Sequence, residues 1–131
     1  MPLLDRVRVH EQSSKTVTFT LLDPAGVAVP LANISTAQLT LLDLDTYVPG
    51  ASPTVGIINS REGQDIRNAH NVTIHSTSGL VTWEMQPGDN PIVTLHRQIE
   101  RHRAEFRFVT TASAELNYPI EIEVVNLRKA G

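Results

Sequence analysis

The sequence predicts an all-β protein built as an antiparallel β-sandwich. The first observation is alternation: several short stretches place apolar and polar side chains in turn, which is the period of two typical of a strand with one buried face. The second is the distribution of turn residues, because eight prolines and seven glycines are spread along the 131 residues. Many short strands separated by frequent turns are typical of β-sandwiches and β-barrels.

Composition limits the class of protein further. Hydrophobic residues make up 40% of the chain and charged residues 19%, which is typical of a globular protein, and the length suits a single domain over residues 1–131. The chain has no cysteine, which excludes disulfides, thiolate nucleophiles and cysteine-bound zinc and favours a reducing compartment or a larger assembly. The net charge of −3 does not suggest nucleic-acid binding, and without a signal peptide or an apolar membrane-spanning run we expect synthesis in the cytoplasm.

The first part of the chain predicts an edge and a central strand. Residues 1–14 are expected to form an N-terminal arm or edge strand, in which residues 6–10 alternate. Residues 15–22 form the clearest strand: threonines occupy one face and apolar residues the other. The outer face carries Thr16, Thr18 and Thr20, and the inner face carries Val17, Phe19 and Leu21. A Pro-Gly turn follows over residues 23–26.

The middle of the chain alternates between strands and loops. We expect an irregular edge segment over 27–34, strands over 37–43, 55–59 and 72–75, and a loop over 46–54. Residues 60–71 form the most polar stretch, a loop held to the core by its one apolar residue, Ile66.

A strand over residues 80–86 lies between a turn glycine and a Pro-Gly-Asp-Asn turn. Val81, Trp83 and Met85 point to one side, and Trp83, the only tryptophan, is expected to be a core anchor. The segment after Pro91 is ambiguous: a short strand over 92–95 is expected, with a helix over 92–102 as the alternative.

Two final strands are predicted over 103–109 and 118–126, separated by a turn over 112–117 and followed by a short tail over 127–131. Arginines on the first strand and glutamates on the second should face each other on the exposed side. The total is about eight or nine strands, which suits an immunoglobulin-like topology without the disulfide of antibody domains. The expected core anchors are Phe19, Trp83, Phe106, Phe108 and Ile122.

Side chains suited to metal binding or catalysis occur without a recognisable pattern. His96, Glu100 and His102 lie close in sequence, but neither a strand nor a helix aligns all three, and Asp43 and Asp45, with Asp65 or Asp89, lack the spacing of a known calcium loop. No Gly-x-Ser-x-Gly elbow and no phosphate-binding glycine loop is present. We therefore expect no metal, no cofactor and no catalytic residue, and we expect the protein not to be an enzyme.

A resemblance to a known group rests on five stretches of the chain. They are Ile58-Asn59-x-Arg61-x-x-Gln64-Asp65-Ile66-x-Asn68, Val72-Thr73, Gly79-x-Val81-Thr82-Trp83-x-Met85-x-Pro87-x-Asp89-Asn90, Glu100-x-His102-x-Ala104-x-Phe106 and Val125-Asn126-Leu127. Over residues 15–127 the chain resembles small β-sandwich proteins encoded among the virion genes of tailed bacteriophages and, more loosely, immunoglobulin-like domains of phage tail and baseplate proteins. These motifs are strand-and-turn patterns and carry no catalytic residues.

The resemblance implies a non-enzymatic virion component that decorates the capsid, seals the head–tail neck or forms part of the tail. Its partners would be the major capsid, neck or tail proteins, bound as a homo-oligomer or lattice, with no nucleic acid and no membrane. The expected contact residues are Arg6, Arg8, Thr16, Thr18, Thr20, Arg61, Gln64, Asp65 and Arg67. The alternative is a carbohydrate- or receptor-binding module of a phage tail or adhesin, which would require exposed aromatic side chains.

Overall fold

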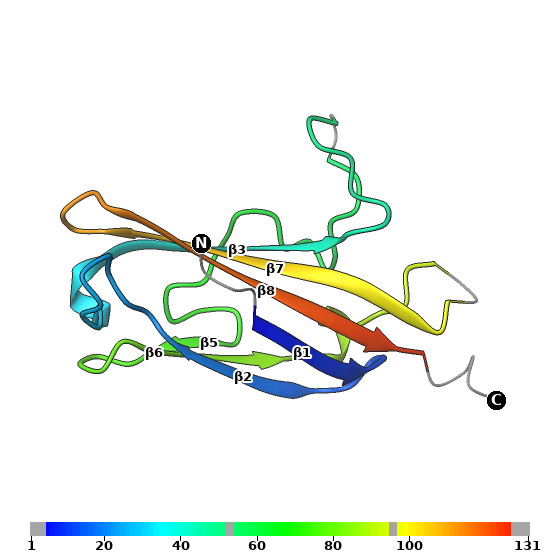
Figure 1. The fold of residues 1–131 in the computed structure, drawn as a ribbon, viewed down its shortest axis with the longest axis horizontal. Coiled ribbons are helices and arrows are strands. Elements are labelled where there is room, and N and C mark those ends of the chain that lie inside the picture. Colours follow the sequence, from blue (N-terminus) through cyan, green and yellow to red (C-terminus); the bar gives the residue numbers. More distant parts are fainter. Residues whose placement is uncertain (1–4, 52–53, 95–96, 127–131) are drawn as a thin grey trace.

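Two β-sheets pack face to face in the computed structural model, which describes residues 5–51, 54–94 and 97–126 (Figure 1). The five-stranded sheet has the order β1 (Asp5–His10), β8 (Glu115–Val125), β7 (Ile99–Thr110), β3 (Ile34–Asp43) and β4 (Gln64–Asp65). The three-stranded sheet has the order β2 (Lys15–Thr20), β6 (Leu80–Met85) and β5 (Val72–Ile74). Two short 3-10 helices, η1 (Leu31–Asn33) and η2 (Pro87–Asp89), lie in connections.

The order of the strands gives the fold class. Neighbouring strands are antiparallel except β1, which pairs with β8 in parallel. An immunoglobulin variable-type sandwich places its G, F, C and C′ strands in one sheet and B, E and D in the other. The second to eighth strands of this chain follow that arrangement as B, C, C′, D, E, F and G. The predicted antiparallel β-sandwich of immunoglobulin-like topology is therefore confirmed, with eight strands among the described residues.

The core between the sheets is built by the inner face of each strand. Val81, Trp83 and Met85 on β6 are all fully buried, as the alternation predicts. Phe19 of β2 crosses to the other sheet, with its ring centroid 5.2 Å from that of Phe106 and stacked 4.0 Å from that of Tyr118. The aromatic contact thus joins β2 and β7, the two strands that a disulfide joins in antibody domains. The expected core anchors are all buried: Phe19, Trp83, Phe106, Phe108 and Ile122.

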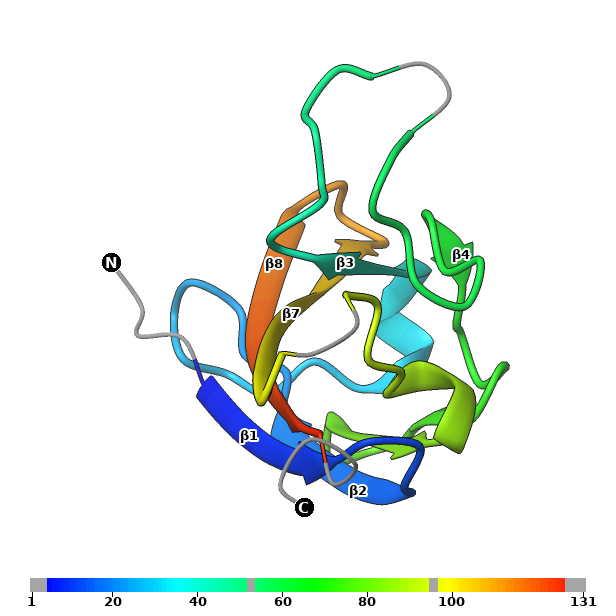
Figure 2. The same ribbon diagram turned by 90° about the vertical axis from the view of Figure 1, so that its right-hand side faces the viewer.

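Two predicted strands are absent. Residues 55–59 form only isolated bridges, Val48 with Val55 and Leu42 with Ile57, within the long connection between β3 and β4. The reason lies in the backbone, because Gly56 and Asn59 have positive φ angles of 90° and 54°, which no extended strand allows. This connection projects away from the body of the sandwich (Figure 2).

The segment after Pro91 is neither of the two structures expected for it. Residues 92–94 lie in no strand, and residues 95 and 96 lie outside the described residues. A helix over 92–102 is excluded because β7 already begins at Ile99. The N–H groups of Val93 and Thr94 donate to the carboxylate of Glu100 at 2.8 and 2.7 Å, so a side chain takes the place of a neighbouring strand.

The predicted loop over 60–71 contains one short strand, β4, which pairs with Gln38 and Leu39 of β3. Most of the remaining predictions differ from the structure in their ends. β7 and β8 are longer than predicted, and a tight turn around Ser113, at a φ angle of 66°, replaces the expected turn over 112–117. Residues 5–10 form the expected edge strand, whereas residues 1–4 and the tail over 127–131 lie outside the described residues. Within the described ranges no helix has the length and hydropathy needed to cross a membrane.

Candidate functional site

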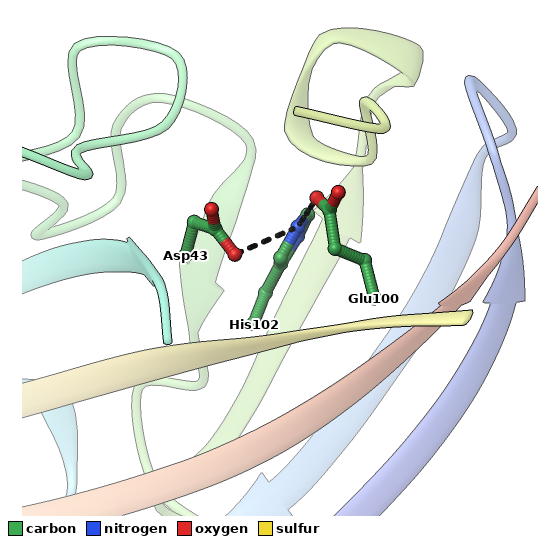
Figure 3. Close-up of side chains that lie close together, drawn as sticks. All are labelled: Asp43, Glu100 and His102. Carbon is green, nitrogen blue, oxygen red and sulfur yellow. Dashed lines mark hydrogen bonds and ion pairs between the residues drawn. The ribbon is translucent and has the colours of Figure 1, made fainter. Parts of the chain in front are cut away.

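Three titratable side chains meet at one end of the inner face of the five-stranded sheet. Asp43 is the last residue of β3, and the strand register places it directly opposite His102 of β7. Glu100 lies two residues before His102, so both side chains point inward from β7 (Figure 3). We call Asp43, Glu100 and His102 the end triad. It continues the inner faces of β3 and β7 beyond Leu41 and Ala104, where an apolar residue would be expected.

The end triad is held by short hydrogen bonds. The imidazole Nε2 of His102 lies 2.7 Å from Oε1 of Glu100 and 4.0 Å from Oδ1 of Asp43. Glu100 also accepts the two backbone N–H groups of the segment after Pro91. Asp43 accepts the hydroxyl of Thr46 at 2.7 Å and the N–H of Asp45 at 3.4 Å. The two carboxylates therefore hold the loops that leave and enter the two strands.

The end triad lacks access to a substrate. All three side chains have 0% exposure, and both oxygens of Glu100 already accept hydrogen bonds. A histidine beside a carboxylate is the arrangement of a general base, but general-base catalysis requires the base to reach the proton that it removes. As it stands, the end triad is a buried structural network that also offers metal-ligating atoms.

A second buried cluster is centred on Asp89, the last residue of η2. Its carboxylate accepts from Nε of Arg61 at 2.6 Å, from Nδ2 of Asn59 at 2.8 Å and from the N–H of Gln86 at 2.8 Å. The same guanidinium donates to Oε1 of Gln64 at 2.7 Å. Arg61 is only 3% exposed, so its prediction as a partner-contact residue is wrong. The sequence pattern predicts an exposed Arg61 because it lies in a polar stretch, and its partner, Asp89, lies 28 residues further along the chain.

The exposed surface carries most of the other predicted contact residues. Thr16, Thr18 and Thr20 lie on the outer face of the three-stranded sheet, and all three are exposed. Asp65 and Arg67 are also exposed, but the guanidinium of Arg67 donates to the carbonyl oxygens of Ile34 and Leu31 at 3.0 and 3.1 Å. Gln64 is half-buried against Arg61. Of the loop residues predicted for contact, Asp65 and Arg67 are thus on the surface.

The outer face of the five-stranded sheet carries columns of alternating charge. β1 contributes Arg6 and Arg8, β8 contributes Glu121 and Glu123, and β7 contributes arginines again. Arg8 lies 3.6 Å from Glu123, and Glu121 is covered by Arg6 at 3.9 Å and by Arg101 at 3.8 Å. The predicted opposition of arginines and glutamates is confirmed by the register. We call this surface the charged face.

One bidentate ion pair lies at the far end of the charged face. The guanidinium of Arg107 donates to both oxygens of Glu115, at 2.9 and 3.0 Å, across β7 and β8. This hydrogen bond, together with the charge of Arg107, holds the pKa of Glu115 below its ordinary value of 4.5. Glu115 therefore stays ionised and paired at neutral pH.

An open hollow lies between the charged face and the projecting connection. It has a volume of about 360 Å³ and is lined by residues that include Thr40, Tyr47, Glu62 and Glu105. Tyr47 is the aromatic residue of this lining, whereas Trp83 is fully buried and Tyr118 stacks on Phe19. The lining of the hollow is mainly polar, and the hollow is partly open to solvent.

The sequence contained a signal for the end triad that spacing alone did not reveal. Continuing the inner face of the strand over 37–43 by two residues beyond Leu41 places Asp43 inward. Continuing the inner face of the strand over 103–109 backward from Ala104 places His102 and Glu100 inward. The pairing of β3 with β7 joins residues far apart in the sequence. Alternation therefore indicates that each of the three side chains faces inward, but it does not indicate that they lie close together.

The fold defines the class as an immunoglobulin-like β-sandwich domain without a disulfide. No family model and no curated protein matches the chain. Among solved structures, the chain is similar to the first immunoglobulin-like domain of human CD48 antigen, with a TM-score of 0.40 and 16% identity over 95% of this chain and 84% of that one. A match at this level adds no information about ligands or partners.

Proposed function

We propose that this chain is a non-enzymatic structural protein of a tailed-phage virion, present in many copies and bound to capsid, neck or tail proteins through the charged face. The proposal combines the sequence resemblance to phage virion proteins with one structural observation. The charged face spans the outer side of β1, β8 and β7 and carries the exposed arginines Arg6, Arg8 and Arg101, whereas the side chains of the end triad are fully buried.

The charges of this face suit recognition by a protein surface with a complementary pattern. Arg6, Arg8 and Arg101 each keep more than half of the side chain exposed, at 68%, 62% and 65%. Exposed ion pairs add little to the stability of the fold, about 0–1 kcal/mol each, so these side chains are free to exchange partners at an interface. Many copies that each make such modest contacts are held by avidity on a symmetric particle.

A carbohydrate- or receptor-binding module is the second candidate, and the hollow beside Tyr47 is the observation that favours it. An aromatic ring flanked by Thr40, Glu62 and Glu105 offers a stacking surface and hydrogen-bond acceptors. Carbohydrate binding would require exposed aromatic side chains, but Trp83 is fully buried and Tyr118 stacks on Phe19. Only Tyr47 contributes an aromatic ring to the lining of the hollow, which makes this candidate the weaker one.

The test is native mass spectrometry and negative-stain imaging of the purified protein, alone and mixed with capsids or tails that lack it. We expect stoichiometric binding to the particle, and an Arg8→Glu variant should bind at least about tenfold more weakly because it reverses a charge on the charged face. Lys15→Glu is the matched control, since Lys15 is exposed on β2 of the opposite sheet.

Each outcome decides between the candidates. If Lys15→Glu weakens binding and Arg8→Glu does not, the contact lies on the threonine-bearing sheet and the charged face is wrong. If the protein stays a monomer, binds no particle and is retained on a glycan array, the virion role is refuted. In that case loss of glycan binding in Tyr47→Ala would support the second candidate.

A further inference from the structure

The end triad brings two carboxyl groups and one imidazole together in the interior, with no arginine or lysine beside them. Among the described residues, His102 is the only basic side chain within 4.0 Å of a carboxylate oxygen of Asp43 or Glu100. The end triad therefore has no permanently charged cationic side chain to pair with its two carboxyl groups. Buried charges in proteins are paired or coordinate metals, because leaving them uncompensated in a medium of low dielectric constant is costly.

A third fully buried carboxylate provides the comparison within this chain. Asp89 is equally buried, yet it is neutralised by the guanidinium of Arg61 at 2.6 Å. No arginine or lysine of the described residues fills that role at the end triad. The imidazole is also incompletely bonded, because Nδ1 of His102 is buried without a hydrogen-bond partner.

The donor atoms suit a divalent transition-metal ion. One imidazole nitrogen and one oxygen from each of two carboxylates lie within 4.8 Å of one another. Ligands bound at about 2.0–2.2 Å around a tetrahedral ion lie roughly 3.4 Å apart, so the 2.7 Å contact between His102 and Glu100 must open and the longer contacts must shorten. Binding therefore requires rotation of these buried side chains. Calcium is disfavoured, because it takes six to eight oxygen ligands and no nitrogen.

We propose that Asp43, Glu100 and His102 bind one divalent transition-metal ion, for which Zn²⁺ is the probe. The ion would take the place of the direct contact between His102 and Glu100 and would supply positive charge to both carboxyl groups. It would join the end of β3 to the start of β7 and, through Glu100, hold the segment after Pro91. A second-shell partner on the free imidazole nitrogen raises metal affinity by about 10–100-fold, so its absence here predicts weaker binding than in a site that has one.

The experiment uses untagged full-length protein treated with a chelator and then dialysed against Zn²⁺. We expect about one equivalent of retained zinc by elemental analysis. At a free zinc concentration a hundredfold above the dissociation constant, the midpoint of thermal unfolding should rise by roughly 10 °C. Asp43→Asn and His102→Gln should each abolish retention and the shift, and His10→Gln, which removes an exposed histidine of β1, should change neither.

Crystals soaked in Zn²⁺ locate the ion even if a variant fails to fold. An anomalous difference peak between Asp43 Oδ1, Glu100 Oε1 and His102 Nε2 supports the site. Peaks only on surface histidines, retention well below one equivalent in the wild type, or retention unchanged in both triad variants would mean an adventitious ion only and overturn the proposal. None of these results depends on the virion role, so the two proposals fail separately.

Discussion

Removal of the buried Asp89 carboxylate is expected to be among the most destabilising single substitutions in this protein. The carboxylate is fully buried and accepts hydrogen bonds from Arg61, Asn59 and the backbone of Gln86. Asp89→Ala leaves the guanidinium of Arg61, itself 3% exposed, without its counter-charge. It also removes one of the two hydrogen bonds of the capping box at the start of η2, the one that the Asp89 carboxylate accepts from the N–H of Gln86.

The magnitude follows from that burial. Breaking a buried ion pair by removing one partner costs about 3–5 kcal/mol, because an uncompensated charge remains. A domain of this kind has a total stability of about 5–15 kcal/mol. For 131 residues, the entropy of unfolding converts each kcal/mol into about 4 °C, so the midpoint should fall by about 12–20 °C.

Urea unfolding followed by tryptophan fluorescence measures this change, since Trp83 lies in the core. The control is Asp45→Ala, which removes an exposed ion pair to Arg97 at 3.1 Å and should cost no more than about 1 kcal/mol. Replacing both charges, as in Arg61→Leu with Asp89→Leu, should recover part of the loss. A cost for Asp89→Ala no larger than that for Asp45→Ala would refute the reasoning.

Two further predictions concern a turn and an ion pair. Gly79→Ala should cost about 2–3 kcal/mol more in urea unfolding than Gly26→Ala: both positions have positive φ, but a Cβ at Gly79 would lie 2.9 Å from the carbonyl oxygen of Val29, while nothing lies within 4 Å of one at Gly26. Equal costs would contradict the predicted clash. Arg107→Gln should raise the pKa of Glu115 toward its ordinary 4.5 in an NMR titration. Because the folded-state pKa is lowered, the pair stabilises the protein above that ordinary value and loses its effect as the pH falls through the folded-state pKa; an unchanged titration would contradict this.

The faces of the strands were predictable because alternation is a local property. In β6 and β7 the inner residues, among them Trp83 and Phe106, follow from the period of two without any knowledge of the partner strand. The length of a strand is a different matter. β7 begins at Ile99 rather than at Arg103, because its first residues pair with the end of β8. The alternation of apolar and polar residues did not predict this extension, because the inward residues Glu100 and His102 are polar.

The residues that sequence analysis misplaced depend on distant partners. Arg61 reads as a loop residue until Asp89, 28 positions later, is brought beside it. His102 and Asp43 are 59 residues apart in the sequence, and only the pairing of β3 with β7 brings them together. The absence of the predicted strand over 55–59 has a local cause instead, because Gly56 and Asn59 have positive φ angles. Both residue types tolerate this conformation, but the hydropathy pattern does not predict it.

The end triad lies where β3 ends and β7 begins, and the Asp89 cluster is tied to β3 because the carbonyl of Arg61 accepts the N–H of Leu41. Further hydrogen bonds link the connections between strands. The side-chain amide of Asn90 donates to the carbonyl of Ser13 at 2.8 Å, and the N–H of Gln12 donates to the carbonyl of Asn90 at 2.7 Å. Directional hydrogen bonds, and no disulfide, therefore join the turn between β1 and β2 to the segment after η2. Arg8 of the charged face does not contribute to these hydrogen bonds, because its ion pair is with Glu123 on the exposed side of the sheet. A loss of particle binding in Arg8→Glu would consequently report on the surface, whereas the effects of Asp89→Ala and of the triad variants report on the buried polar clusters.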